Sequence, residues 1–482
     1  MSYLDIILVN AHQARTSKLI ALTTGMTAPL GITYIASYLR KHGFNVKILD
    51  NDIEQFDGNQ FKHYINSNKP RCVAISSLTN SINNAFLLAA VVKTVDPDIP
   101  VVFGGAHATS LPEQSLLDQA VDVVVRGEGE ETMLELLDAL IHHRPLTQIV
   151  GITYKDHGQA CKNPDREYIK DIDRIPFPAY DLLPMNRYYL NSTRRLTNRK
   201  IGVILTGRGC PYRCTFCSRL FKTNVRLRSP ENVIKEIKFL IKEYGVGEIH
   251  FLDDTFTFDK DRAIAICRLI RRNNLDIIWN CNSRVEHASD ELYSELYSAG
   301  CRELFYGAES GSQHILDSLK KGISLAQTEK AVQLCKKHKM LVYCSFVYGS
   351  PEETKETLAE TLAFARKLNP DFVVFCMLIP FPGTALFQEA VKRGFIDLRN
   401  VEWDQYMNLM STDPPPVNMS VLSNEELIAW SKKAFRELYF NPRYVIKSIK
   451  RISSFTQVYE LARGFMAVLS HQIWQFKSKV KG

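Results

Sequence analysis

TGRGCPYRCTFC (206–217) continues the apolar stretch IGVILT (201–206), with which it shares Thr206, and together they decide the fold of the central part of the chain. The second stretch brings Cys210, Cys214 and Cys217 together with the spacing C-x3-C-x2-C. Because the apolar stretch is typical of a buried strand, we expect the cysteines on a loop at its carboxyl end. Three thiols this close in sequence are more typical of a metal site than of core packing.

Two kinds of metal site fit three clustered cysteines. A structural zinc site needs four ligands, and the nearest further candidates are His250 and Cys267, far along the chain. An iron–sulfur cluster is usually held by four cysteines, so three would leave one iron open to another ligand. The other eight of the eleven cysteines stand apart, and the odd count favours a reducing cytoplasm over disulfides. The sequence therefore favours an iron–sulfur cluster and keeps zinc as the alternative.

Strand and helix patterns alternate regularly around the cysteines. We expect a helix to follow each of six strands, and Ser229 and Pro230 predict the amino end of the first helix. Six such units predict a partial (β/α)6 barrel of TIM type, spanning 196–395, with its chemistry at the carboxyl ends of the strands. The expected strands are 201–206, 248–254, 277–283, 303–309, 342–349 and 372–379.

The first 145 residues show a separate alternation. Short apolar strands between helices predict a doubly wound, Rossmann-like parallel sheet covered on both faces, which binds ligands past the carboxyl ends of its strands. The proline-rich stretch 146–195 is expected to be a connector, and 396–482 a helical region. The strands expected in the first domain are 4–10, 45–50, 72–78, 100–105 and 121–128.

The positive charge is concentrated at one end of the chain. Of the formal net charge of +8, the stretch 440–482 supplies most, with eight basic residues against Glu460. A whole-chain nucleic-acid function is therefore not expected. Basic residues mixed with aromatic ones predict either a helical cap over the barrel or a peripheral membrane contact. Neither a signal peptide nor a membrane-spanning apolar run is expected.

The cysteine motif, with Phe216 as the aromatic residue before Cys217, resembles the radical S-adenosylmethionine (SAM) superfamily. The resemblance implies a 4Fe-4S cluster on the three cysteines, which cleaves SAM to a 5′-deoxyadenosyl radical and takes its electron from a flavodoxin- or ferredoxin-like donor. It covers about 195–395, although the usual Gly-Gly-Glu is not obvious. The further segments that carry it are FLDDTFTFD (251–259), WNCNSRVE (279–286), YGAESGS (306–312), FVYGSPEET (346–354) and IPFPGTAL (379–386).

The same resemblance implies which residues contact SAM. Arg284 is the candidate for the SAM carboxylate, because a guanidinium binds a carboxylate through two hydrogen bonds. Glu309 and Ser310 are candidates for the ribose or methionine polar groups, and Phe216 flanks the cluster. The alternative for Arg284 and Glu309 is an ion pair at the barrel end, and Asp253 and Asp254 are either structural or catalytic.

The first domain resembles that of the cobalamin-binding class of this superfamily. The matching segments include AISSLTN (74–80) and VFGGAHAT (102–109). The mutase-type motif D-x-H-x-x-G is reduced here to His12, so we do not expect a histidine ligand to cobalt; a domain that binds no cobalamin is the alternative. The residues expected to contact cobalamin are Ser77, Leu78, Gly104, Gly105, His107 and Gly127.

Three functions fit these expectations. The first is methylation of an unactivated carbon of a small-molecule or lipid substrate, with cobalamin delivering the methyl group. The second uses the same cofactors for cyclisation, oxidation or rearrangement. The third, from another class, is a zinc-stabilised binding protein without catalysis.

Overall fold

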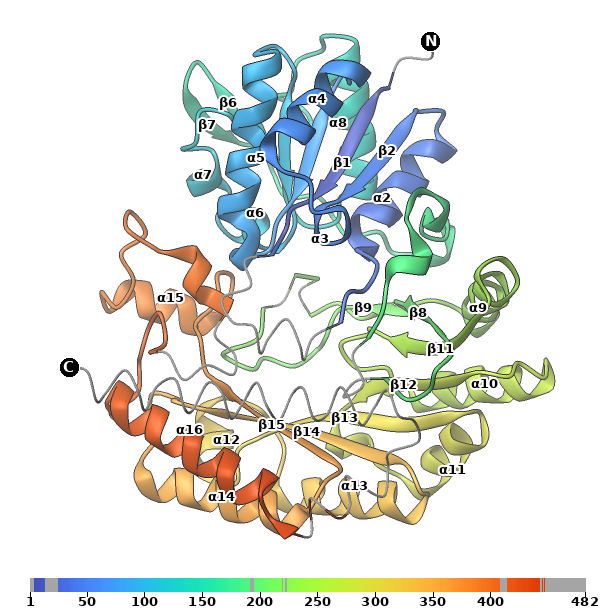
Figure 1. Ribbon diagram of the computed structural model, residues 1–482, viewed down its shortest axis with the longest axis vertical. Coiled ribbons are helices and arrows are strands. Elements are labelled where there is room, and N and C mark those ends of the chain that lie inside the picture. The colour runs from blue at the N-terminus through green and yellow to red at the C-terminus, as the bar shows by residue number, and fades with distance from the viewer. Residues whose placement is uncertain are drawn as a thin grey trace.

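A computed structural model describes residues 4–13, 25–190, 195–218, 220–221, 223–407, 414–442, 444 and 446. Figure 1 shows an α/β domain at the top and a curled sheet with outer helices below it. The cysteine-bearing segment lies between the two. The expected fold class, a doubly wound domain followed by a partial barrel, is therefore confirmed.

The first domain is built on one seven-stranded sheet in the order β2-β1-β3-β4-β5-β6-β7. β1 to β5 are parallel. Alternate residues of β1 point to opposite faces: Ile6 and Leu8 pack with α2 and α8, whereas Ile7 and Val9 pack with α4 and α5. The elements are β1 (Ile6–Asn10), α2 (Leu30–Lys41), β2 (Val46–Asp50), α3 (Asn51–Glu54), α4 (Gly58–Asn68), β3 (Val73–Ser76), α5 (Ile82–Val95), β4 (Val101–Gly104), α6 (Ala106–Ser110), α7 (Pro112–Ser115), β5 (Val123–Val125) and α8 (Glu130–Ile141).

A hairpin extends this sheet into the stretch expected to be a connector. β6 (Ile152–Asp156) pairs antiparallel with β5, and β7 (Gln159–Lys162) pairs with β6. The two-residue turn between them places His157 and Gly158 at positive φ, as a type I′ turn requires. Beyond the hairpin, the described residues before the second domain form 3-10 turns and an isolated bridge between Tyr189 and Met26, as the prolines predict.

The second domain is a six-stranded sheet in the order β15-β14-β13-β12-β11-β8. All five neighbouring pairs are parallel, and β8 and β15 are the two open edges, so the barrel is partial as expected. The strands are β8 (Lys200–Ile204), β11 (Val246–Phe251), β12 (Ile278–Ser283), β13 (Cys301–Glu309), β14 (Leu341–Tyr348) and β15 (Phe372–Met377).

Helices cover the outside of this sheet, as Figure 1 shows. The first of them begins where expected: the Ser229 hydroxyl accepts from the backbone N–H of Asn232, Pro230 is the first helical residue, and Gly245 ends the helix in the left-handed conformation. The covering helices are α9 (Pro230–Tyr244), α10 (Lys260–Arg272), α11 (Asp290–Ser298), α12 (Gln313–Ser318), α13 (Leu325–Lys337) and α14 (Lys355–Leu368). α15 (Ala385–Lys392) lies instead toward the first domain, and its buried residues belong to the same apolar cluster as those of α5.

The carboxyl-terminal region is described only in part. It contains a 3-10 helix (Trp403–Met407) and α16 (Asn424–Tyr439), whose Trp430 packs on Phe375 of β15. The basic stretch 440–482 lies almost entirely outside the described residues, so the choice between a helical cap and a membrane contact stays a prediction. Within the described part of the chain, no helix combines the length and apolarity needed to cross a bilayer.

Candidate functional site

The three cysteines lie on one loop closed by a small antiparallel ribbon. Its strands, β9 (Gly207–Arg208) and β10 (Arg226–Leu227), pair with each other, so residues 209–225 form the loop between them. Gly209 starts the loop at φ 97°, and a Cβ there would lie 2.3 Å from the carbonyl oxygen of Asn224. Only glycine fits this position, which fixes where the cysteines leave the ribbon.

The loop is fastened to the carboxyl end of the barrel. The Thr215 N–H donates to the carbonyl of Leu319 at 3.0 Å, and the Leu386 N–H donates to the carbonyl of Thr215 at 2.9 Å. Phe216 packs, half-buried, against the apolar core. The loop therefore lies where the barrel's chemistry is expected.

The structure raises the pKa of two of the three cysteine thiols, Cys210 and Cys217. Cys214 is buried, Cys210 is half-buried, and all three cysteines are free of disulfides. Burial raises the pKa of Cys210, although the nearby Arg284 acts against it. The pKa of Cys217 is raised to about 12 by partial desolvation of its sulfur and by the neighbouring Cys214, although the residue as a whole is exposed. A cationic iron–sulfur centre would supply the charge that keeps these sulfurs deprotonated, so three thiols suit such a cluster chemically. Among the described residues, however, the three side chains are not gathered into a preformed metal site.

Arg284 extends from the end of β12 to the cysteine loop. Its guanidinium lies over the ring of Tyr212 at 3.4 Å. Its Nε donates to Glu286 at 2.6 Å, and its Nη2 donates to the carbonyl of Lys321 at 2.7 Å. The structure thus brings Arg284 to the cysteine loop, where a ligand carboxylate could meet it, and also gives it an ion pair with Glu286.

Glu309 forms a buried ion pair, the alternative expected for it, with a partner, Lys321, that the sequence did not reveal. Its carboxylate accepts from Lys321 Nζ at 2.7 Å. Burial would lower the pKa of Lys321, but the Glu309 carboxylate outweighs it and raises that pKa. A Cβ on Gly307 would lie 2.1 Å from a Glu309 oxygen, so the glycine makes room for the pair. Lys321 also acts electrostatically on Cys214 and Cys217, which places a second cation beside the cysteines.

Ser310 and Asp253 are engaged within the protein. Ser310 is fully buried, and its hydroxyl lies 3.0 Å from that of Thr361 on α14. Asp253 accepts from the backbone N–H of Thr206 at 2.6 Å and from its hydroxyl, so it orders the chain just before the cysteines. Asp254 differs: it is exposed, and its charge acts on Cys210. It is an acidic side chain that a ligand ammonium could meet near Cys210.

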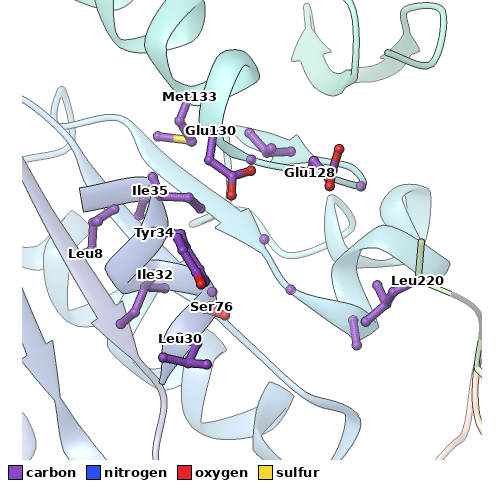
Figure 2. A pocket seen from close by; sticks show the side chains of 18 of the residues that line it. Leu8, Leu30, Ile32, Tyr34, Ile35, Ser76, Glu128, Glu130, Met133 and Leu220 are labelled. Atoms are coloured by element: carbon purple, nitrogen blue, oxygen red, sulfur yellow. The ribbon is translucent and has the colours of Figure 1, made fainter. Parts of the chain in front are cut away.

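The first domain contains a cavity of about 220 Å³ at the carboxyl side of its sheet. Figure 2 shows its wall, with Tyr34 and Glu130 pointing toward the space. Gly31, Gly104 and Gly127 line it, and a Cβ on any of them would meet no atom closer than 3.8 Å within the protein. The glycines therefore leave space that side chains would fill, which fits a large ligand. Leu205, Arg208, Leu220 and Phe221 of the second domain close the cavity.

Of the other residues expected at this site, Gly105 belongs to the cavity wall, whereas Ser77, Leu78 and His107 do not. Gly105 lines the cavity at φ 91°, where a Cβ would lie 2.5 Å from the carbonyl of Ser77. Ser77 is buried and donates its N–H to Gly104, whereas Leu78 is exposed. His107 is buried: its Nδ1 lies 3.3 Å from the Thr79 hydroxyl, and its ring contacts Trp403.

His12 lies at the end of β1, where its Nδ1 is 3.1 Å from an oxygen of Asp52. Sequence analysis missed Arg208 and Arg226, which join the two domains through Glu128 and Glu130. The signal was present as two carboxylates flanking Gly129 and two arginines flanking the cysteine loop, but their pairing depends on tertiary structure.

Comparison with known proteins gives two family matches in the expected order. The B12 binding domain matches residues 17–137, and the radical SAM superfamily matches residues 204–365. An uncharacterized methyltransferase of Pyrococcus horikoshii is 36% identical over 93% of this chain and 95% of its own length. An anaerobic magnesium-protoporphyrin IX monomethyl ester cyclase of Rubrivivax gelatinosus is 32% identical over 76% of this chain and 66% of its own length.

Among solved structures, the cobalamin-dependent SAM radical enzyme OxsB, with aqua-cobalamin and SAM bound, superposes with a TM-score of 0.75 at 19% identity. The match covers 98% of this chain and 71% of OxsB. At this identity the similarity shows a shared fold across nearly the whole chain.

Proposed function

We propose that this chain, which belongs to the radical SAM superfamily and carries a B12 binding domain, is a cobalamin-dependent enzyme that methylates an unactivated carbon. The family assignment favours an enzyme over the zinc-stabilised binding protein. The methyltransferase from Pyrococcus horikoshii, similar over almost its full length, supports methyl transfer. Small-molecule and lipid substrates remain the two classes within the proposal.

One structural observation carries the proposal. The cavity of the first domain is closed by residues from the same segment that holds the cysteines, so the two sites adjoin. When bound, the groups would supply reductive cleavage of SAM at the cluster and a methyl carrier at the corrinoid. The cavity and the cysteine loop are adjacent, which supports a reaction that needs both groups.

Different residues would bind the cluster, SAM and the corrinoid. Cys210, Cys214 and Cys217 would hold the cluster. Two cations near it, Arg284 and Lys321, suit a carboxylate of SAM, and Asp254 suits its ammonium. Gly104, Gly105 and Gly127 would let the backbone approach the corrinoid closely.

A second function within the same family is also supported. A relative with 32% identity, from Rubrivivax gelatinosus, is named as a cyclase and not as a methyltransferase. Cyclisation, oxidation or rearrangement is therefore the second candidate. Both candidates need an external electron donor, which we propose to be flavodoxin- or ferredoxin-like. A membrane contact through 440–482 remains a prediction, to be tested by vesicle flotation.

The experiment needs no knowledge of the substrate. Anaerobically reconstituted protein is incubated with SAM and a reductant, with and without hydroxocobalamin, and the nucleoside products are separated. We expect 5′-deoxyadenosine in both cases and S-adenosylhomocysteine only with hydroxocobalamin. Cys214→Ala should abolish the formation of 5′-deoxyadenosine. Cys267→Ala, at a buried cysteine of α10 outside the cysteine loop, should not. Production of 5′-deoxyadenosine without any cobalamin-dependent S-adenosylhomocysteine would favour the second candidate.

A further inference from the structure

Arg208 connects the cysteine loop to the cavity of the first domain. It lies two residues before Cys210, on β9. Its Nη1 donates to Glu128 at 2.8 Å, and its Nη2 donates to Glu130 at 2.6 Å. Both glutamates line the cavity, as does Arg208 itself. The Arg208 guanidinium therefore forms part of the cavity wall and also supports the cysteine loop.

The second strand of the ribbon holds the same carboxylate. Arg226, on β10, donates Nη1 to both oxygens of Glu128, at 2.8 and 2.7 Å. Since β9 and β10 close the loop that contains all three cysteines, both ends of that loop are fixed to Glu128. The loop also carries Leu220 and Phe221, which wall the cavity.

These bonds are buried, so they do not tolerate displacement. The side chains of Arg208 and Arg226 are 6% and 9% exposed, and those of Glu128 and Glu130 are 4% exposed. The two positive charges balance the two negative ones. A shift of the cysteine loop away from the cavity would leave a charge buried without its partner, which is strongly unfavourable. The loop and the cavity wall are therefore expected to move together.

We propose that Arg208 is a positioning residue through which the two cofactor sites stabilise each other. The inference rests on the proposed function, because it needs both a cluster and a corrinoid. A cluster on the cysteines and a corrinoid in the cavity would each order the segment 205–228. The second group to bind would then lose less conformational entropy than the first. Such coupling is reciprocal, so each group should bind more tightly when the other is present.

The test measures hydroxocobalamin binding by absorbance titration of the full chain under anaerobic conditions, with and without the reconstituted cluster. We expect the protein with its cluster to bind about tenfold more tightly, within the usual range of coupling between sites. In Arg208→Lys and in Glu130→Gln this ratio should fall toward one. In the reverse direction, hydroxocobalamin should slow the release of iron to a chelator in the unaltered protein and not in the variants.

Glu135→Gln is the matched control. Glu135 lies on the same helix as Glu130 and pairs with an arginine, Arg166, that does not belong to the cysteine loop. The Glu135→Gln variant should keep the full difference in hydroxocobalamin affinity between the protein with and without its cluster. Equal affinity with and without the cluster in the unaltered protein would overturn the coupling while leaving cobalamin binding intact. No binding in either form would overturn the corrinoid part of the proposed function. If a variant fails to fold, the comparison on the unaltered protein still decides whether the two sites are coupled.

Discussion

The guanidinium carbon of Arg284 lies 3.4 Å from the ring centre of Tyr212, which stands between Cys210 and Cys214. An arginine at the end of β12 is thus stacked on the loop that holds the cysteines, and its orientation depends on that loop. Two of its nitrogens are bonded to Glu286 and to the backbone of Lys321. The stacking therefore connects the support of the cluster to the predicted contact with SAM.

Arg284→Lys should separate these two roles. Lysine keeps the charge but loses the planar group that stacks on Tyr212 and binds a carboxylate through two hydrogen bonds. We expect iron content and the cluster's paramagnetic resonance signal to be retained, while the Kd for SAM rises about tenfold, equivalent to about 1.4 kcal/mol.

Arg302→Lys is the control, because Arg302 stacks on Tyr297 at 4.3 Å near the start of β13, away from the carboxyl end of the barrel. Its affinity for SAM should be unchanged. Wild-type SAM affinity in Arg284→Lys would remove Arg284 from the binding site.

The buried pair of Lys321 and Glu309 predicts an effect on stability. Lys321→Met leaves the Glu309 carboxylate buried without its cation, so the free energy of unfolding should fall by about 3–5 kcal/mol. The double variant Glu309→Gln with Lys321→Met should recover most of this loss. Denaturant unfolding of the cluster-free protein measures both.

An exposed ion pair, Lys260 with Glu291, is the control for the buried pair. Lys260 Nζ lies 2.6 Å from Glu291 Oε2 with both side chains exposed to solvent, so Lys260→Met should lower stability far less than Lys321→Met. If Lys321→Met costs no more than Lys260→Met, the buried pair does not stabilise the fold as its geometry indicates.

The sequence predicted the strands of both parallel sheets because buried parallel strands are short apolar runs between helices. It missed the hairpin β6–β7. Its turn, His157-Gly158, adopts positive φ at both residues without the Asn-Gly or Asp-Gly pair that usually marks a type I′ turn. Local sequence therefore gave a weak signal there, and the proline-rich stretch that follows suggested a connector throughout.

The candidate site was predicted unevenly for a physical reason. The cysteines are close in sequence, so their spacing alone predicts a metal site. The pairing of Glu128 with Arg208 joins residues 80 positions apart, and that of Glu309 with Lys321 depends on how the chain turns after β13. Ser310 resembles a ligand contact in sequence, but its hydroxyl meets Thr361 of the protein itself. Which polar groups face a ligand is decided by packing.

Substitutions at two glycines of the first domain should have different effects, one on hydroxocobalamin affinity and the other on stability. A Cβ on Gly31 would meet no atom within 4 Å, and Gly31 lines the cavity. Gly31→Leu should therefore leave the unfolding free energy nearly unchanged while filling space that the corrinoid needs, so hydroxocobalamin affinity should fall at least about tenfold.

Gly105→Ala should behave differently, because its φ of 91° and the 2.5 Å approach to the Ser77 carbonyl strain any side chain. We expect it to lower stability by about 1–3 kcal/mol. Denaturant unfolding without cofactor, followed by hydroxocobalamin titration, compares the two variants. Unchanged hydroxocobalamin affinity in Gly31→Leu would place the corrinoid elsewhere.

His107 predicts how stability depends on pH. Burial lowers the pKa of His107 to about 4, because the ring is enclosed beside Thr79 and Trp403. The unfolded chain has a histidine pKa of about 6.5, so between pH 6.5 and pH 4 it binds a proton that the folded protein does not. Stability should therefore be fully present above pH 6.5 and fall as the pH drops toward 4, by up to about 3 kcal/mol from this residue.

His107→Gln isolates this contribution, since glutamine can still bond to the Thr79 hydroxyl but does not titrate. The difference in unfolding free energy between pH 7 and pH 4.5 should be smaller in the variant than in the unaltered protein by about 2–3 kcal/mol. His143→Gln provides the control, because His143 follows α8 in a surface turn and should leave the pH dependence unchanged. Identical pH profiles for His107→Gln and the unaltered protein would mean that His107 binds a proton in the folded state, contrary to its enclosure.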